Sequence, residues 1–285
     1  MMNQSTNTNN PVPQSGFPAN FLKIFAALTM LIDHAAITLV YAKMAAYPEY
    51  VTLVFSGETI AEEVAATIPA EFLSLYSMYR VMRLVGRIAF PIFAFLLFEG
   101  FMHTSNHKRY LLRVGLCALL AEIPFNLIVT TAAPVYRLTG VETSLLYPNY
   151  QNTVFTLFLA LLMLCAMKWL EPSEDLPKTA FVRWLGQLAC VLAACVISVV
   201  ARLDYSYICI LFVTVLYFFR YNKKMQIIFG CLIFLVTNTD IAALLAFVPI
   251  AMYNGYIIRS KKFKYFFYIF YPAHLLVLYL ISLVM

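Results

Sequence analysis

Long apolar runs recur along nearly the whole chain, and they constrain the fold more than any other feature. Of the 285 residues, 62% are hydrophobic and only 12% are charged, whereas a soluble globular protein carries about 25% charged residues. A run of about 20 apolar residues crosses a bilayer as a helix, which satisfies its backbone hydrogen bonds internally. The sequence therefore predicts an all-α, polytopic integral membrane bundle.

Hydropathy divides the chain into about nine predicted transmembrane helices. They cover residues 20–41, 84–102, 110–131, 152–170, 183–202, 205–220, 225–237, 240–258 and 265–284. With the N-terminus in the cytoplasm, basic residues concentrate in the inner loops, as the positive-inside rule requires. The exceptions are Arg80, Arg83 and Arg87, at the predicted outer end of the second span. Their shared helix face indicates a role there.

Two regions lie outside the predicted spans. Residues 1–20 are uncharged and rich in Asn, Gln, Ser and Thr, so we expect a disordered tail before a membrane domain over residues 21–285. Residues 43–82 are acidic and form the longest predicted loop, which we expect on the extracytoplasmic side with an interfacial helix over residues 61–82. The net charge of +6 is explained by the basic residues of the cytoplasmic loops. We therefore expect the lipid bilayer as a partner and no nucleic acid.

The first span carries an Asp33–His34 dipeptide, deep enough in the membrane to be costly unless it is functional. His34 can act as a general base. Asp33 points about 100° away around the helix, so it is no automatic partner of His34. Arg83 and Arg87 can bind an anion or stabilise developing negative charge. The structural alternatives are an interhelix hydrogen bond for the dipeptide and contact with outer headgroups for the arginines.

Two later spans carry polar groups at similar depth. Glu122 and Asn126 share a face of the third span around Pro124, which predicts a kinked helix that lines a cavity. The last span places His274 near the middle of the membrane, one turn after Tyr271. An aromatic belt is the structural alternative, but such a belt stops near the interface.

The predicted inner side of the bundle carries Glu99 and His103, followed by Lys108, Arg109 and Arg113. We expect these residues to line a cytoplasmic access route and to meet anionic groups. A polar helix cap and the positive-inside rule explain them equally well. The histidines and cysteines show no ligand spacing, so no metal is expected.

Six motifs occur in order: Leu22–Phe25 with Met30–His34, Arg83–Phe101, Lys108–Arg113, Glu122–Asn126, Asn152–Leu159 and Tyr268–His274. Together they resemble the TraX family, whose namesake is the conjugative F-pilin acetylase of bacteria. The first span and the Arg–Pro span are also distantly similar to membrane-bound acyltransferases of the acyltransferase-3 type. By position, His34, Arg87 and His274 match family motif residues, and Asp204 begins a short Asp–Tyr motif.

The resemblance implies a multi-pass acetyltransferase of the bacterial inner membrane. It would move an acetyl group from cytosolic acetyl-CoA to an extracytoplasmic acceptor, either a protein N-terminus such as a pilin or a surface glycan. Either histidine can be the base, and direct transfer and an acetyl-histidine intermediate are both open. The alternative is a secondary transporter or permease that uses the buried charges. The expected catalytic residues are His34, Asp33, Arg87 and His274, with substrate binding by Arg83, Glu122, Asn126, Asn152, Asp204 and Tyr271, and donor binding by Glu99, His103, Lys108, Arg109 and Arg113.

Overall fold

A computed structural model describes residues 15–56, 67–132, 150–171, 179–237, 241–256 and 261–284. These parts of the chain are helical, with two isolated β-bridges. The expected disordered tail over residues 1–20 lies largely outside the described residues. In chain order the helices are α1 (Ala19–Ala35), the π-helix η1 (Ala36–Val40), α2 (Tyr41–Met44), α3 (Pro48–Phe55), α5 (Ala70–Gly86), α6 (Ala89–His103), α7 (His107–Ala132), α9 (Thr153–Trp169), α10 (Ala180–Val200), α11 (Ser206–Phe218), α12 (Lys223–Val236), the 3-10 helix η2 (Ile241–Ala246), α13 (Phe247–Ala251) and α14 (Lys261–Ser282).

Five helical stretches in the described residues are long and apolar enough to cross a membrane. Shorter apolar helices accompany them, including α9 and α11. The nine predicted spans stay a prediction, because several of them correspond to helices too short to cross a bilayer upright. The cytoplasmic N-terminus stays a prediction as well. The five long stretches are Ala19–Met44, Ala70–His103, His107–Thr130, Ala180–Val200 and Tyr265–Ser282.

The predicted second span is the lower half of a longer, interrupted helix. α5 and α6 follow each other with only Arg87 and Ile88 between them. Pro91 lies in the first turn of α6, where its missing N–H is tolerated. It cannot donate to the carbonyl one turn earlier, at Arg87, so the interruption falls at that residue. This break places the arginine at a junction of two helices rather than at the start of a continuous span.

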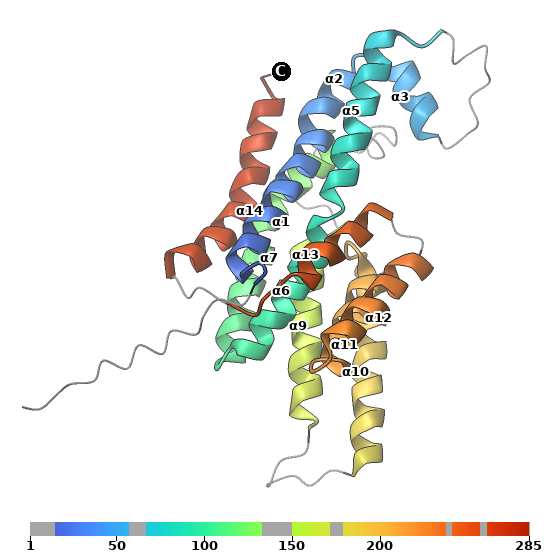
Figure 1. Cartoon of the computed structure of the whole chain (residues 1–285). Helices are drawn as coiled ribbons and strands as arrows, with labels where there is room; N and C mark the ends of the chain where they lie inside the picture. The colour runs from blue at the N-terminus through green and yellow to red at the C-terminus, as the bar shows by residue number, and fades with distance from the viewer. Residues whose placement is uncertain are drawn as a thin grey trace, which may run out of the picture.

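Much of the segment expected as a loop over residues 43–82 is helical. α3 lies beside the ends of α2 and α5, and the three form the upper arm of the molecule in Figure 1. Their apolar side chains make a separate small core that includes Tyr41, Val51, Phe72 and Tyr79. This core supports the upper end of α5 and so fixes the position of the arginines at its lower end.

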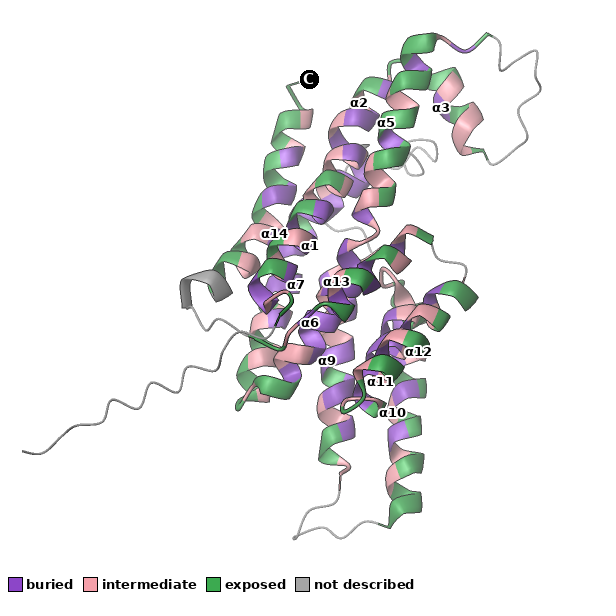
Figure 2. Ribbon diagram, viewed as in Figure 1, coloured by how far each residue is buried: buried purple, intermediate pink, exposed green. Residues whose placement is uncertain are grey.

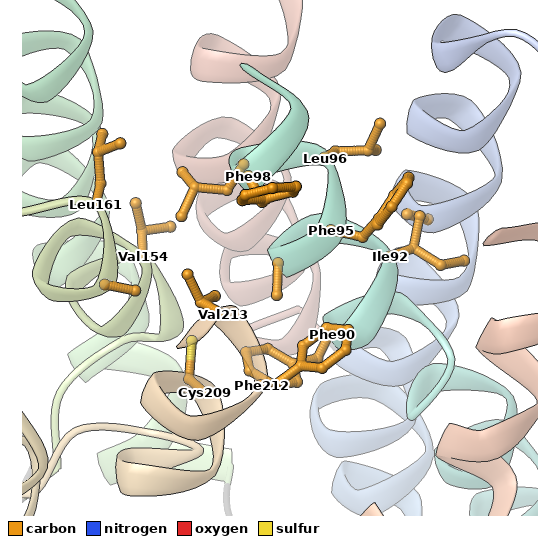
Figure 3. Close-up of a cluster of buried hydrophobic side chains, with 14 of the residues drawn as sticks. Phe90, Ile92, Phe95, Leu96, Phe98, Val154, Leu161, Cys209, Phe212 and Val213 are labelled. Atoms are coloured by element: carbon orange, nitrogen blue, oxygen red, sulfur yellow. The ribbon is translucent and has the colours of Figure 1, made fainter. Parts of the chain in front are cut away.

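The main core is organised around α6, which packs against α1, α9 and α11. Its aromatic and aliphatic side chains are buried almost all around the helix, as Figure 3 shows for Phe90, Ile92, Phe95 and Phe98. A helix that is apolar on every side is stable only when neighbours surround it. α6 is therefore the central element of the described bundle.

α10 is the opposite case. It is apolar, yet most of its large side chains are exposed, with Phe181 75% and Val200 76% accessible. Figure 2 shows exposed residues along most of its length. An exposed apolar helix of this length is typical of a lipid-facing surface. We therefore expect a polar site on the helices away from α10.

Candidate active site

One elongated cavity of about 810 Å³ runs between α1, α5, α6, α7, α9 and α14. At one end its wall includes His34, Arg87 and Asp204. At the other it includes Lys23 and Arg113. His34 lies eleven positions after Lys23 in α1, which is about 16 Å at the rise of an α-helix. The cavity therefore connects two polar ends through an apolar middle that α6 supplies.

His34 and His274 meet at the first end. Nδ1 of His34 lies 2.6 Å from Nε2 of His274, although the residues are 240 positions apart in the sequence. The π-helix η1 begins two residues after His34, and Thr38 within it donates a hydrogen bond to the His34 carbonyl at 2.7 Å. Such π-bulges occur frequently at functional sites. The histidine is thus held by a local distortion of its own helix.

The second hydrogen bond of His274 sets the proton arrangement of the pair. Nδ1 of His274 lies 2.8 Å from the carbonyl oxygen of Phe270, which can only accept. Nδ1 of a neutral His274 therefore carries the proton, and its Nε2 accepts from Nδ1–H of His34. The remaining nitrogen, Nε2 of His34, keeps its lone pair. His34 lines the cavity whereas His274 does not, so this lone pair is available to a bound molecule.

Aromatic rings hold the pair in place. The His274 ring lies between Phe270 and His34, with centroid distances of 4.9 Å on both sides. Tyr271 contacts both imidazoles edge-on and also lines the cavity. His274 is 6% exposed, so its orientation is fixed by packing as well as by hydrogen bonds.

Asp33 has a different partner from His34. One of its carboxylate oxygens lies 2.6 Å from Nη1 of Arg83. The carboxylate rests against the backbone of α5 at Gly86, where an added Cβ would lie 2.2 Å from the Asp33 side chain. The glycine therefore allows the close approach of α1 and α5 that this ion pair requires.

Arg87 hydrogen-bonds with the Tyr205 hydroxyl and lies near the carboxylate of Asp33, and Asp204 also lies near Tyr205. Asp204 accepts hydrogen bonds from the Tyr150 hydroxyl at 2.6 Å and from the Thr153 hydroxyl. Its position depends on a tight turn before α11, in which Tyr205 has φ = 56°. Left-handed backbone at a non-glycine residue stores strain and clusters at functional sites. Asp204 and Arg87 are thus both positioned at the cavity wall.

Glu122, Asn126 and Asn152 are brought together elsewhere. The Asn152 amide donates to Glu122 at 2.5 Å and to the Ala118 carbonyl at 3.0 Å. The Asn152 side-chain oxygen caps α9 by accepting from Val154 N–H. All three polar residues are buried, and none is part of the cavity wall. They form a polar lock between α7 and α9, and the structure does not bring these expected substrate-binding residues to the cavity.

The expected donor-binding residues divide at the other end. His103 and Arg113 line the cavity, whereas Lys108 and Arg109 are exposed on the first turn of α7 and do not. Glu99 lies beside His103, with 3.8 Å between a carboxylate oxygen of Glu99 and Nδ1 of His103, and is outside the cavity wall. Two of the five residues therefore line the cavity, and donor binding by any of them stays a prediction.

Sequence reasoning missed several residues of the cavity wall. They include Lys23, Tyr79 and Tyr110. A lysine one turn into an apolar helix was a usable signal for Lys23, since such a charge is costly in a bilayer. Nothing distinguished the two tyrosines from the other aromatic residues of the chain.

Comparison with known proteins adds the family. A profile described as TraX protein matches residues 19–282. The chain is also similar to the probable fimbrial assembly protein FimC, serogroup H1, of Dichelobacter nodosus, with 35% identity over 92 residues. That match covers 30% of this chain and 33% of the relative, so it spans about one third of the relative's length. No solved structure matches the chain. Because the profile covers nearly the whole sequence, the chain belongs to the TraX family.

Proposed function

We propose that the protein is a membrane-bound acetyltransferase that moves an acetyl group from acetyl-CoA to an acceptor on the other side of the bilayer. The observation that carries this proposal is the contact of His34 with His274 at the wall of the cavity, from which a free lone pair on Nε2 of His34 is inferred. A general base must present such an unprotonated atom to the proton it removes. The family, whose namesake acetylates F-pilin, supports the same reaction.

The reaction begins with attack of an acceptor amine or hydroxyl on the thioester carbonyl. Nε2 of His34 takes the proton of the attacking group, and the carbonyl oxygen becomes negatively charged. Arg87 stabilises this oxyanion from the neighbouring wall. The C–S bond then breaks, the proton on His34 passes to the departing thiolate, and acetylated acceptor and CoA are released. The proton that His34 takes from the acceptor is given to CoA, so His34 returns to its starting state and no further reactant is needed.

His274 acts through His34 and is a positioning residue. Its hydrogen bond holds the proton of His34 on Nδ1 and leaves Nε2 free to act as the base. Attack by Nε2 itself, which forms an acetyl-histidine before the acceptor enters, uses the same tautomer. Asp33 holds Arg83 and thereby fixes the charge pattern around the site.

The acceptor is a pilin-like surface protein in this proposal. The fimbrial assembly protein that is 35% identical to this chain over 92 residues supports such a partner, although a surface glycan carries equally suitable hydroxyl groups. The positive-inside pattern of the sequence supports a cytoplasmic position for the Lys23 and Arg113 end, on the side where acetyl-CoA is found. Neither the family nor this relative points to a transporter.

Transfer from labelled acetyl-CoA tests the proposal. Purified protein in lipid vesicles is incubated with the labelled donor and with pilin-rich or glycan-rich surface extracts. We expect His34→Ala to lower the transfer rate by about 100- to 10,000-fold, the range for loss of a general base. His107→Ala is the matched control, because His107 contacts the Phe101 carbonyl and lies outside the cavity wall.

Two results would refute the enzyme. One is transfer by His34→Ala at the wild-type rate. The other is a wild-type protein that neither acetylates any acceptor nor releases CoA from the labelled donor. A hydroxylamine-sensitive label on the protein, lost on addition of acceptor, would identify the acetyl-histidine route.

A further inference from the structure

The cavity wall carries more positive than negative charge, and the excess lies at one end. Four side chains with permanent or near-permanent positive charge line it, and two carboxylates do. Both carboxylates belong to the His34 end. There Asp33 pairs with Arg83, and Asp204 and Arg87 both lie near Tyr205. The remaining two cations, Lys23 and Arg113, lie at the other end.

Lys23 has no hydrogen bond or ion pair to any residue that the structure describes. It is half-buried, one turn into α1, and the side chains around it on that helix are apolar except for Asn20 one turn earlier. A lysine in a membrane helix without a partner is costly unless its charge meets a ligand or water. The cavity is the place where Lys23 meets either.

Arg113 contributes a second charge with unused donors. Its guanidinium lies 5.8 Å from the ring centroid of Tyr110 and hydrogen-bonds with the hydroxyl of Tyr268. Its buried Nε has no hydrogen-bond partner among the described residues. The two tyrosines thus hold the guanidinium against the cavity wall while leaving a donor unsatisfied. The nearest carboxylate along α6, Glu99, is paired with His103 and does not line the cavity.

The geometry points to an anion site at Lys23 and Arg113 that binds the phosphate groups of the acetyl donor, an inference that rests on the proposed function. A donor with its thioester at His34 and its phosphates at Lys23 must be long and thin. The two ends of this cavity are about 16 Å apart along α1. The extended pantetheine arm of CoA joins thioester and phosphates over a comparable span, through the apolar middle that Phe93, Leu96 and Leu97 line.

This assignment also separates donor-binding residues from the general positive charge of the inner loops. Lys108 and Arg109 are exposed and outside the cavity wall. A phosphate bound by surface loops would need them, whereas a phosphate bound inside the cavity needs Lys23 and Arg113. Lys23 belongs to the first helix with His34, so one rigid element sets the distance between the anion site and the base.

Binding of CoA itself to the full-length protein in detergent tests the site without any catalysis. We expect Lys23→Met and Arg113→Gln each to raise the dissociation constant for CoA, measured by calorimetry, by about 10- to 100-fold. This is the effect of removing a hydrogen bond to a charged group. Lys224→Met and Arg183→Gln are the matched controls. Both residues lie on other helices outside the cavity wall, and their variants should bind CoA as the wild type does.

A donor without phosphates distinguishes the loss of phosphate binding from a folding defect in the variant. With S-acetylpantetheine as donor, Lys23→Met should match the wild type, and the loss in kcat/KM should appear only with acetyl-CoA. An equal loss with both donors, or wild-type CoA affinity in both variants, would overturn the inference. A wild-type protein that does not bind CoA would overturn it as well. Lys23-dependent CoA binding without acetyl transfer to any acceptor would leave the anion site standing and refute the proposed function.

Discussion

Replacing His274 by leucine removes the acceptor that holds the proton of His34 on Nδ1. A net hydrogen bond of this kind is worth about 1 to 1.5 kcal/mol, which corresponds to roughly a tenfold preference for one tautomer. The substitution also removes the ring whose centroid lies 4.9 Å from that of His34, so the imidazole is less well oriented. Together these effects predict a fall in kcat of about 10- to 100-fold, smaller than the loss from removing a general base.

His274→Gln is the informative companion variant. The side-chain oxygen of glutamine can accept from Nδ1–H of His34, so we expect kcat within about fivefold of the wild type. Because His274 does not line the cavity, the KM for acetyl-CoA should stay unchanged in both variants. A change in kcat alone means that the lost interaction acts in the transition state.

The assay is the steady-state rate of acetyl transfer at varied acetyl-CoA, with the thermal unfolding midpoint of each variant measured in the same detergent. The reasoning fails if His274→Leu keeps the wild-type kcat. It also fails if the glutamine and leucine variants lose the same activity at equal unfolding midpoints, because His274 would then only fill space. A larger loss in His274→Leu than in His34→Ala would exchange the roles of the two histidines.

The remaining predictions concern the supports of the site. Gly86→Ala should lower stability by about 1 to 3 kcal/mol, because its Cβ would lie 2.2 Å from the Asp33 side chain and an overpacked contact must open; an unchanged thermal unfolding midpoint would contradict the close packing of α1 on α5. Glu122→Gln should keep both stability and activity, since its amide oxygen can still accept from Asn152, whereas Glu122→Leu leaves that buried amide unpaired and should cost about 1 to 3 kcal/mol. Loss of activity in a stable Glu122→Gln variant would instead return Glu122 to the substrate-binding residues.

Helices were predictable because hydropathy is a local property, but their number as membrane spans was not. The run over residues 205–220 was predicted as a span and appears as α11, with 13 residues, and the run over 225–237 appears as α12, with 14. Such helices are too short to cross a bilayer upright. Hydropathy measures only whether a segment is apolar, and a segment buried among protein helices is as apolar as one in lipid.

The outer segment shows a second limit. Its charged and polar residues suggested a loop over residues 43–82 with an interfacial helix over 61–82, whereas α5 runs from Ala70 to Gly86 and nearly joins α6. The contacts that hold this part of the chain are long-range ones between α3, α5 and α2. Helix propensity alone could not reveal them.

The polar residues themselves were visible in the sequence, because a charge in an apolar run is costly and conspicuous. His34, Arg87 and His274 were identified in this way, as was the 100° angle that keeps Asp33 away from His34 on the helix. Indeed, Asp33 pairs with Arg83 on another helix. Glu122 was equally conspicuous and forms part of the lock with Asn152 rather than a cavity wall.

The sequence by itself determined that the chain is a helical membrane protein and which polar side chains its interior must accommodate. Only the tertiary structure decided how they pair. The contact between His34 and His274 joins residues 240 positions apart, and the proton direction within it depends on the carbonyl of Phe270. The physical reason is that the cost of burying a charge depends on one residue, whereas the partner that offsets this cost depends on how distant helices pack.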